Sequence, residues 1–299
     1  MLDPELLYQS VPEIWDSMAG TRPVLVHLLE GYMDAGDIGS EIRDQLLDHG
    51  NPELLVRFDV DQLHDYRSRR PTVVFDTDHW VSVEEFELGL YRLVDQAGTP
   101  FLLLAGPEPD NQWNRTRRAI TTLCDRLDVR LAVTAYGIPT GIPHTRPTLI
   151  HSYSNNPDLV GENTSIFGRA ELPGSFGATL ELALAEQGID TLGLATHVPH
   201  YLAQANFAQA AVTAVERLQE VAGLSLDLPQ LEQRARTNLA DITNEVKESS
   251  EVQAVVAQLE QQYDQYQADQ PGPLPSADEI GAELERFLAE RNRKDEEGR

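Results

Sequence analysis

The chain has 299 residues, a formal net charge of −26 and 41% apolar residues. Its length fits one large domain, or one domain with an appendage, and its apolar share is enough for a buried core, which argues against general disorder. So negative a charge repels nucleic-acid phosphates and anionic membrane surfaces, and we therefore expect neither as a partner.

Cysteine and lysine are scarce. The single cysteine, Cys124, excludes internal disulfides and cysteine zinc clusters. Both lysines, Lys247 and Lys294, lie in the last quarter of the chain, so lysine Schiff-base chemistry is close to excluded before them. The first ten residues lack the basic start and apolar run of a signal peptide, and no stretch approaches the ~18 apolar residues of a membrane span. We expect a cytoplasmic protein.

Strands and helices are predicted to alternate over residues 1–225. Apolar runs predict strands at 24–29, 54–58, 72–75, 101–105, 129–136, 148–153 and 191–196. Amphipathic stretches predict helices near 37–48, from Ser82 through Val94, and over 111–127, 175–187 and 202–222. This alternation with uniformly apolar strands predicts an α/β fold in which helices flank a mostly parallel sheet on both faces.

A helical C-terminal region is predicted from residue 226 onward. Asp227 and Pro229 have the residue types of an N-cap and a first helical turn, and two apolar stripes on either side of 248–250 predict a helical hairpin. The proline-rich segment 271–275 predicts a stiff linker before a last helix that Ser276 would open. We therefore divide the chain into an α/β body, 1–225, and a helical appendage, 226–299.

The glycine-rich turn 31–39 follows a predicted strand and precedes a helix. Gly31 and Gly36 have the spacing of a Walker loop, but Asp37 stands where that motif requires lysine. Asp34 adds a second carboxylate, and two carboxylates at a helix N-terminus repel a phosphate. We favour helix capping and close backbone packing for Asp34 and Gly36. A binding rim at the carboxyl edge of the sheet stays open as the alternative.

Two turns at strand ends carry histidines. His144 and Arg146 precede one predicted strand, and His197, His200 and Tyr201 follow another. No obvious acidic or thiol ligand accompanies His197 and His200, so we expect no metal. The two turns could converge as an acid–base pair in a cleft or binding rim. Hydrogen bonding of the imidazoles to loop carbonyls is the favoured alternative.

Ser175 stands in a sequence that invites comparison with a serine nucleophile. A nucleophile elbow needs glycine two positions before the serine, and Pro173 is found there. Ser175 is predicted instead to cap the helix that follows it. Because no catalytic constellation is complete, we assign no catalytic residue and expect no cofactor.

Six motifs in order along the chain resemble the proteasome assembly chaperone 2 family, and in particular its actinobacterial branch. They are EGYMDAGDIG (30–39), FDVDQLHDYRSRRP (58–71), LLLAGPEPDNQW (102–113), GIPTGIPHTRP (137–147), ELPGSFGATLE (171–181) and ATHVPHYLAQ (195–204). Together they span residues 20 to 225, and the C-terminal helices lie outside this resemblance.

The resemblance implies a phosphorylase/hydrolase-like α/β fold, self-association, and a link to proteasome assembly without known catalysis. We therefore expect a non-enzymatic, homo-oligomeric chaperone or adaptor with a proteasome-related partner. The alternative is a hydrolase or phosphorylase-like enzyme, which would need a cleft at the sheet edge. Such a cleft would be lined by Asp34, His144, Arg146, His197 and His200.

Overall fold

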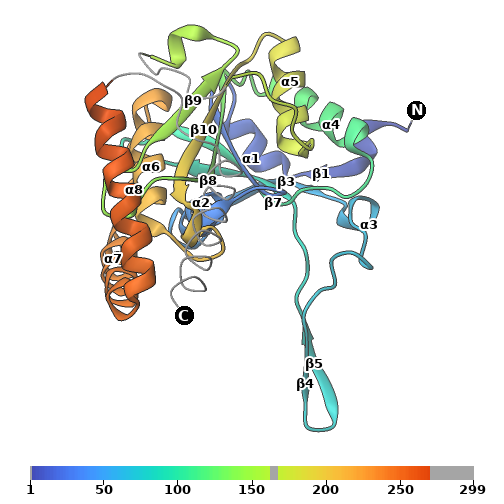
Figure 1. Cartoon of the computed structure of the whole chain (residues 1–299). Helices are drawn as coiled ribbons and strands as arrows, with labels where there is room; N and C mark the ends of the chain where they lie inside the picture. The colour runs from blue at the N-terminus through green and yellow to red at the C-terminus, as the bar shows by residue number, and fades with distance from the viewer. Residues whose placement is uncertain (1, 162–167, 270–299) are drawn as a thin grey trace, which may run out of the picture.

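The structure is a computed structural model that describes residues 2–161 and 168–269. Their strands form one eight-stranded sheet and one two-stranded sheet (Figure 1). The strands of the large sheet, in their order across it, are β1 (Tyr8–Ser10), β3 (Glu53–Phe58), β6 (Gly89–Val94), β7 (Pro100–Pro107), β2 (Val24–Glu30), β8 (Leu131–Thr140), β10 (Asp190–Pro199) and β9 (Ile150–Ser154).

The large sheet is mixed, with its parallel part in the middle. The strands β7, β2, β8 and β10 are parallel neighbours, and Val24 of β2 lies opposite Leu131 of β8. On the two sides, β6 pairs with β7 and β9 pairs with β10 in antiparallel fashion. The predicted α/β class is confirmed, with the parallel part confined to these four strands. The carboxyl ends of these four strands lie at the same end of the sheet, and the loops that follow the strands meet there.

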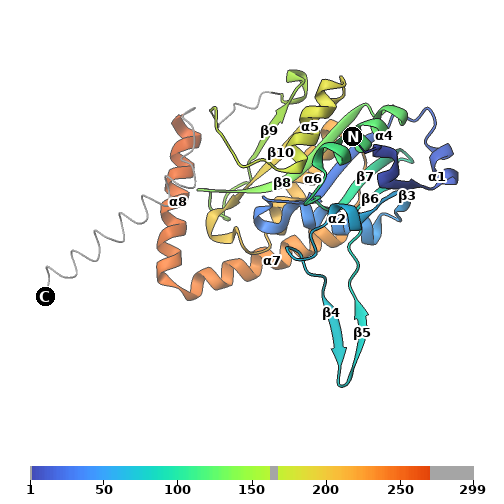
Figure 2. The same ribbon diagram turned by 90° about the vertical axis from the view of Figure 1, so that its right-hand side faces the viewer.

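Helices cover both faces of this sheet. They are α1 (Pro12–Ser17), α2 (Ile38–His49), α3 (Val60–Leu63), α4 (Trp113–Arg126), α5 (Phe176–Glu186), α6 (Ala208–Ala222), α7 (Pro229–Glu248) and α8 (Ser250–Asp269), with short 3₁₀ turns at η1 (Pro4–Leu7), η2 (Ala35–Asp37), η3 (Pro157–Leu159) and η4 (His200–Leu202). Figure 2 shows α4 and α5 on one side of the sheet and α2 and α7 on the other.

The core consists of two clusters, one on each face of the sheet. Val26 of β2 packs in the cluster with α2 and α6, while its neighbour Leu25 packs in the cluster with α4 and α5. Both side chains are fully buried. Burial on both faces explains why the central strands read as continuous apolar runs without alternation. Cys124 of α4 is buried in the second cluster, and burial raises the pKa of its thiol to about 12.

The helix predicted from Ser82 through Val94 is wrong. Ser82 belongs to the short strand β5, and Gly89–Val94 forms β6, which pairs with both β3 and β7. Leu90 and Leu93 are buried in opposite core clusters, so a strand with two covered faces imitates the spacing of a helical stripe. Asp95 closes the β6–β7 turn by accepting hydrogen bonds from the backbone of residues 97 and 99.

The two described C-terminal helices differ in their packing. Three apolar side chains of α7, Leu231, Ala235 and Ile242, are buried in the core cluster that contains α2 and α6. In Figure 2, α8 turns away from α7 at a corner, so the predicted hairpin of two antiparallel helices is wrong. Asp227 does not cap α7 either, because the N-cap is Leu228. The division at residue 226 stays a prediction, and the segments 271–275 and 276–299 lie outside the described residues.

A two-stranded arm projects from the body (Figures 1 and 2). It consists of β4 (Val73–Asp76) and β5 (His79–Val83), which pair in antiparallel fashion around a tight turn at Thr77 and Asp78. We call residues 73–83 the arm. The predicted strand at 72–75 therefore exists but lies outside the main sheet.

None of the described helices combines the length and the apolar character that a membrane crossing requires.

Candidate functional site

The turn after β2 is organised around the carboxylate of Asp34. Its Oδ1 accepts hydrogen bonds from the backbone N–H groups of Gly39 (2.9 Å) and Gly137 (3.1 Å), and its Oδ2 accepts one from Ser40 (2.9 Å). Asp34 thus binds the first turn of α2 and ties it to β8. The favoured interpretation, helix capping with close backbone packing, is confirmed, and the oxygens of this carboxylate are occupied by the protein's own N–H groups.

Gly36 lies in the same turn, pressed against β10 and the start of α6. Its φ is +72°, and an added Cβ would lie 3.1 Å from Val198 and 3.2 Å from Phe207. Its backbone N–H donates to the carbonyl of Ala203, and its carbonyl accepts from the N–H of Phe207. Gly36 therefore serves close packing between the turn and the chain that follows β10. All of these contacts of Gly36 are made to other parts of the protein itself.

His144, Arg146 and Tyr201 are brought together at the carboxyl edge of the sheet. The backbone N–H of His144 donates to the Tyr201 hydroxyl oxygen at 2.9 Å, and its Nδ1 lies 2.6 Å from the same oxygen. Burial lowers the pKa of the His144 imidazole and raises the pKa of Tyr201 to about 12. Both groups are neutral at pH 7. The two turns thus meet through His144 and Tyr201, and their use as an acid–base pair stays a prediction.

Arg146 connects this loop to α8. Its guanidinium donates two hydrogen bonds to the Asp264 carboxylate, at 2.7 and 2.8 Å, and one to Glu260 at 3.2 Å. The Tyr263 hydroxyl donates to the carbonyl of Pro147 at 3.2 Å. These contacts dock α8 over the loop that follows β8, where a free guanidinium would otherwise face solvent.

We expect Arg146→Met to loosen α8 without unfolding the body. Exposed ion pairs contribute at most ~1 kcal/mol each, so the melting temperature of the body should change little. In limited proteolysis with chymotrypsin, which does not cut at arginine, cleavage within α8 should become faster. Arg236→Met, which removes the exposed pair between Arg236 and Glu232 on α7, is the matched control. Equal cleavage rates in both variants would show that Arg146 does not hold α8.

His197 and His200 differ in their relation to this loop: the His200 ring packs edge to face on that of Tyr201, with centroids 5.5 Å apart, whereas His197 is buried within β10. His197 is in β10 and 1% exposed, and burial, with a smaller effect from His151, lowers its pKa to about 4. His200 opens the 3₁₀ turn η4, and burial lowers its pKa as well. Across residues 2–161 and 168–269, no group of three or more histidine, cysteine, aspartate or glutamate side chains has an arrangement that could hold a metal ion.

A cavity of about 250 Å³ lies beside the carboxyl-terminal half of β2, the middle of β8 and the start of α5. Asp34 is the one predicted rim residue among the described residues that line it. The polar side chains that line it from the strands include His27, Tyr136 and Tyr153, and Glu181 lines it from α5. Sequence reasoning missed all four. For the residues on strands, the signal that could have identified them is a polar residue inside an otherwise apolar strand, such as His27 in VLVHLL.

The cavity holds a short chain of hydroxyl and carboxyl groups. The Tyr136 hydroxyl donates to that of Tyr153 at 3.3 Å, which in turn donates to Oε1 of Glu181 at 3.3 Å. Burial raises the pKa of the Glu181 carboxyl to about 7 and lowers that of the His27 imidazole to about 4. Ser175, at the mouth, accepts a hydrogen bond from the N–H of Ala178, which confirms its predicted role as the N-cap of α5.

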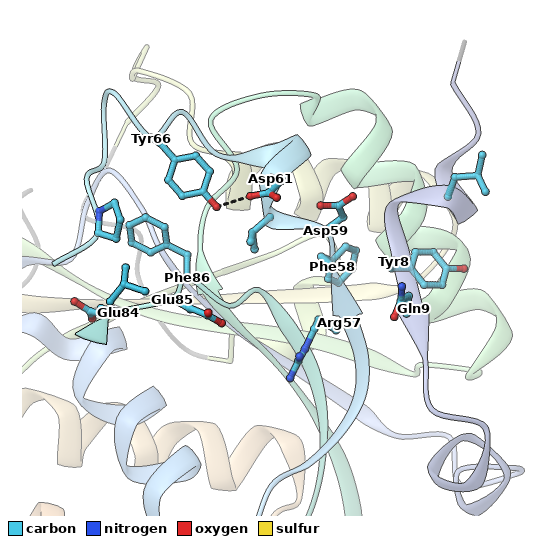
Figure 3. Close-up of a pocket in the computed structure, with 14 residues that line it drawn as sticks. Tyr8, Gln9, Arg57, Phe58, Asp59, Asp61, Tyr66, Glu84, Glu85 and Phe86 are labelled. Atoms are coloured by element: carbon cyan, nitrogen blue, oxygen red, sulfur yellow. Dashed lines mark hydrogen bonds between the residues drawn. The ribbon is translucent and has the colours of Figure 1, made fainter. Parts of the chain in front are cut away.

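A second, more open pocket of about 520 Å³ lies at the base of the arm (Figure 3). Four acidic side chains, Asp59, Asp61, Glu84 and Glu85, line it together with Arg57 and with apolar and aromatic residues. In Figure 3 the Tyr66 hydroxyl points to Asp61, to which it donates at 2.6 Å, beside the ring of Phe86. Among the described residues that line the pocket, acidic groups outnumber the one arginine, and they lie beside aromatic rings.

The arm itself exposes a row of large apolar side chains. Their exposed fractions are 50% for Val73, 49% for Val74, 54% for Phe75, 68% for Trp80, 56% for Val81 and 49% for Val83. The rings of Phe75 and Trp80 pack edge to face with centroids 5.0 Å apart. Exposed apolar surface of this extent is typical of an interaction site rather than of a free monomer surface.

These features define an α/β protein with a mixed sheet between helical layers, carrying an apolar arm and two pockets. The sequence matches the PAC2 family over residues 28–246. The chain therefore belongs to the PAC2 family, the proteasome assembly chaperone 2 family that its motifs resemble.

Solved structures agree with this assignment. A Mycobacterium tuberculosis protein of unknown function is 39% identical, with a TM-score of 0.83 and coverage of 88% of this chain and 92% of its own. A Corynebacterium glutamicum protein of unknown function is 35% identical, with a TM-score of 0.81 and coverage of 87% and 97%. A second Mycobacterium tuberculosis protein, described as a proteasome-assembly chaperone homologue, shares the fold at 21% identity, with a TM-score of 0.70 and coverage of 78% and 99%. A comparison of the sequence with curated proteins found no match.

Proposed function

We propose that this protein is a non-enzymatic, homo-oligomeric chaperone or adaptor that acts in the cytoplasm on a proteasome-related protein. The observation that carries the proposal is the arm, whose six large apolar side chains are each about half exposed or more. Membership of a family related to proteasome assembly chaperones and activators gives the proposal its direction.

The arm is poorly suited to stand alone in water. A single two-stranded hairpin is marginally stable at best, and its outer edges carry unpaired backbone groups that invite pairing with another chain. Packing Phe75 and Trp80 against a second copy would cover both the apolar side chains and these edges. Because every copy carries the same arm, such contacts repeat from subunit to subunit and lead to a symmetric oligomer.

The charge distribution separates the arm from the pocket at its base. The arm's tip carries Asp76 and Asp78, and the pocket contains four acidic side chains, so the tip of one copy is repelled from the pocket of another. This leaves the pocket free in the oligomer that we propose. A basic and aromatic segment of a different protein would complement it, and we assign it to the proteasome-related partner.

Self-association is tested by a double variant, Phe75→Ser with Trp80→Ser. We expect the wild-type chain to form a stable oligomer at micromolar concentration and the variant to give a monomer near 33.3 kDa in light scattering. Leu182→Ser is the matched control, because Leu182 is also exposed, at 67%, but lies on α5. A monomeric wild-type chain, or an oligomer unchanged by the double variant, would contradict the proposal.

The partner is tested with purified proteasome core particles of an actinobacterium. We expect the wild-type chain to co-elute with the particle or with its unassembled subunits, and the pair Asp61→Asn with Glu84→Gln to weaken this association. This double variant should keep the oligomeric state of the wild type, since neither Asp61 nor Glu84 belongs to the arm. If neither intact particles nor free subunits bind the wild-type chain, the partner is wrong even where the oligomer is right.

An enzymatic function is the second candidate, and one observation favours it. A carboxyl group with a pKa of about 7, as for Glu181, suits general acid–base catalysis at neutral pH. The residues proposed for its cleft, however, divide among the Asp34 turn, the His144 loop and the buried His197. We therefore place the binding function first.

A further inference from the structure

The cavity between β2, β8 and α5 has a composition that selects its ligand by charge. Three carboxyl groups, from Asp34, Glu108 and Glu181, line it, and no arginine or lysine does so among the described residues. The chain as a whole carries −26, which deepens the negative potential in a recess. Phosphates, carboxylates and other anions are therefore excluded.

Two of the three carboxyl groups are already engaged by the backbone. Asp34 accepts three N–H groups, and Oε2 of Glu108 accepts the N–H of Phe176 at 3.0 Å at the start of α5. Among the described residues, Glu181 accepts one side-chain hydrogen bond, the long one of 3.3 Å from the Tyr153 hydroxyl. Glu181 is thus the carboxyl group with capacity left for a ligand.

A second observation concerns His27, which lines the same cavity. Nε2 of His27 has no hydrogen-bond partner among the described residues, although His27 lines the cavity and is 2% exposed. A buried polar nitrogen without a partner is costly, and a ligand atom that pairs with it removes that cost. The imidazole is neutral at pH 7, because burial lowers its pKa to about 4, so it does not repel a positive charge.

The remaining walls are aromatic and apolar. Tyr32, Tyr136 and Tyr153 contribute rings, and Leu172 and Pro173 line the side toward the loop before α5, where Leu172 is 75% exposed. Aromatic faces attract organic cations placed over them. At about 250 Å³ the cavity is smaller than the sites of drug-sized molecules, so it suits a compact ligand.

We propose that this cavity binds a small organic cation, an amine attached to an apolar or aromatic group, with its ammonium on Glu181 and a second polar atom on His27. The inference goes beyond the proposed chaperone function and does not depend on the arm. Glu181 deprotonates when the cation binds, so affinity rises with pH between 6 and 8. The titratable groups that face Glu181 across the cavity are His27, Tyr32, Asp34, Glu108, Tyr136 and Tyr153.

Three probes of matched shape test the charge selection by calorimetry on the full chain: benzylammonium, benzyl alcohol and benzoate. We expect benzylammonium to bind with a Kd on the order of 1 mM or tighter. Benzyl alcohol should bind more weakly, and benzoate not at all. Benzoate binding as tightly as benzylammonium, or no binding by benzylammonium at millimolar concentration, would overturn the proposal.

Variants and pH locate the cation. Glu181→Gln should weaken benzylammonium binding about tenfold to a hundredfold, the contribution of a hydrogen bond to a charged group. Glu186→Gln, on the exposed side of the same helix, should leave the affinity unchanged. The wild-type affinity should rise between pH 6 and pH 8. An affinity that is independent of both Glu181 and pH would place the cation elsewhere. Light scattering on the same samples separates this outcome from a failure of self-association.

Discussion

Replacing Gly137 with alanine is expected to lower the free energy of unfolding by ~3 kcal/mol, through overpacking and the loss of a charge-assisted hydrogen bond. A Cβ at position 137 would lie 1.7 Å from the carbonyl oxygen of Ala35 and 2.9 Å from the Ile38 side chain. The turn would have to move away from β8. In doing so it would stretch the hydrogen bond from the Gly137 N–H to Asp34, which is 3.1 Å long.

Gly177→Ala is the control for this experiment. Gly177 is in the first turn of α5, where an added Cβ meets only Oγ of Ser175, at 3.9 Å. Alanine favours a helix over glycine by up to ~1 kcal/mol, so this variant should be as stable as the wild type or slightly more stable. Urea unfolding followed by circular dichroism measures both changes. A Gly137→Ala protein within ~0.5 kcal/mol of the wild type would mean that the turn tolerates displacement, and that its close contact with β8 is unimportant for stability.

The second large effect is a change of stability with pH that Glu181 causes. Burial raises the pKa of this carboxyl from 4.5 to about 7 in the folded protein. Between these two values the folded chain binds more protons than the unfolded chain, so the free energy of unfolding decreases as pH rises. The full penalty is present above pH 7. From pH 5 to pH 8 it amounts to ~2–3 kcal/mol.

Glu181→Gln removes this titration, and its stability relative to the wild type isolates the effect. The difference should be small at pH 5 and should favour the variant by ~2–3 kcal/mol at pH 8. Subtraction is necessary because His27 and His197, with pKa values of about 4 in the folded protein, make the wild type less stable toward acid. Glu186→Gln serves as the control. A variant that is less stable than the wild type at pH 8 would show that the ionised Glu181 is favourably bonded.

The class of fold was predictable because the central strands are covered on both faces. The predicted run 24–29 became β2, 101–105 became β7 and 111–127 became α4, with their ends displaced by a few residues. The failure at Ser82–Val94 has the same physical origin. In β6 both faces are covered as well, so its apolar residues fit a helical spacing as well as a strand. The Asp95 turn to β7 was the signal that could have decided between them.

The candidate site was less accessible to sequence reasoning. Asp34 could be assigned as a cap because two of its partners, Gly39 and Ser40, are a few residues away in the chain. The cavity polar groups come from four separate segments, at His27, Tyr136, Tyr153 and Glu181, and no local spacing connects them. Their proximity follows from the strand order β2–β8–β10–β9 and the position of α5, and neither can be read from one sequence. The sequence also did not reveal that the arm is exposed, because the apolar residues of the arm resemble those of a buried strand.

The buried thiol of Cys124 makes the arm accessible to spectroscopy. With a pKa of about 12 and an exposed fraction of 2%, this thiol has almost no reactive thiolate at neutral pH. It is also the one cysteine in the sequence. A cysteine introduced at the tip of the arm, as Asp78→Cys, would therefore take up a maleimide dye or spin label selectively in the otherwise unaltered chain. In the oligomer that we propose, the distance between two such labels would report directly how the arms of different copies are arranged.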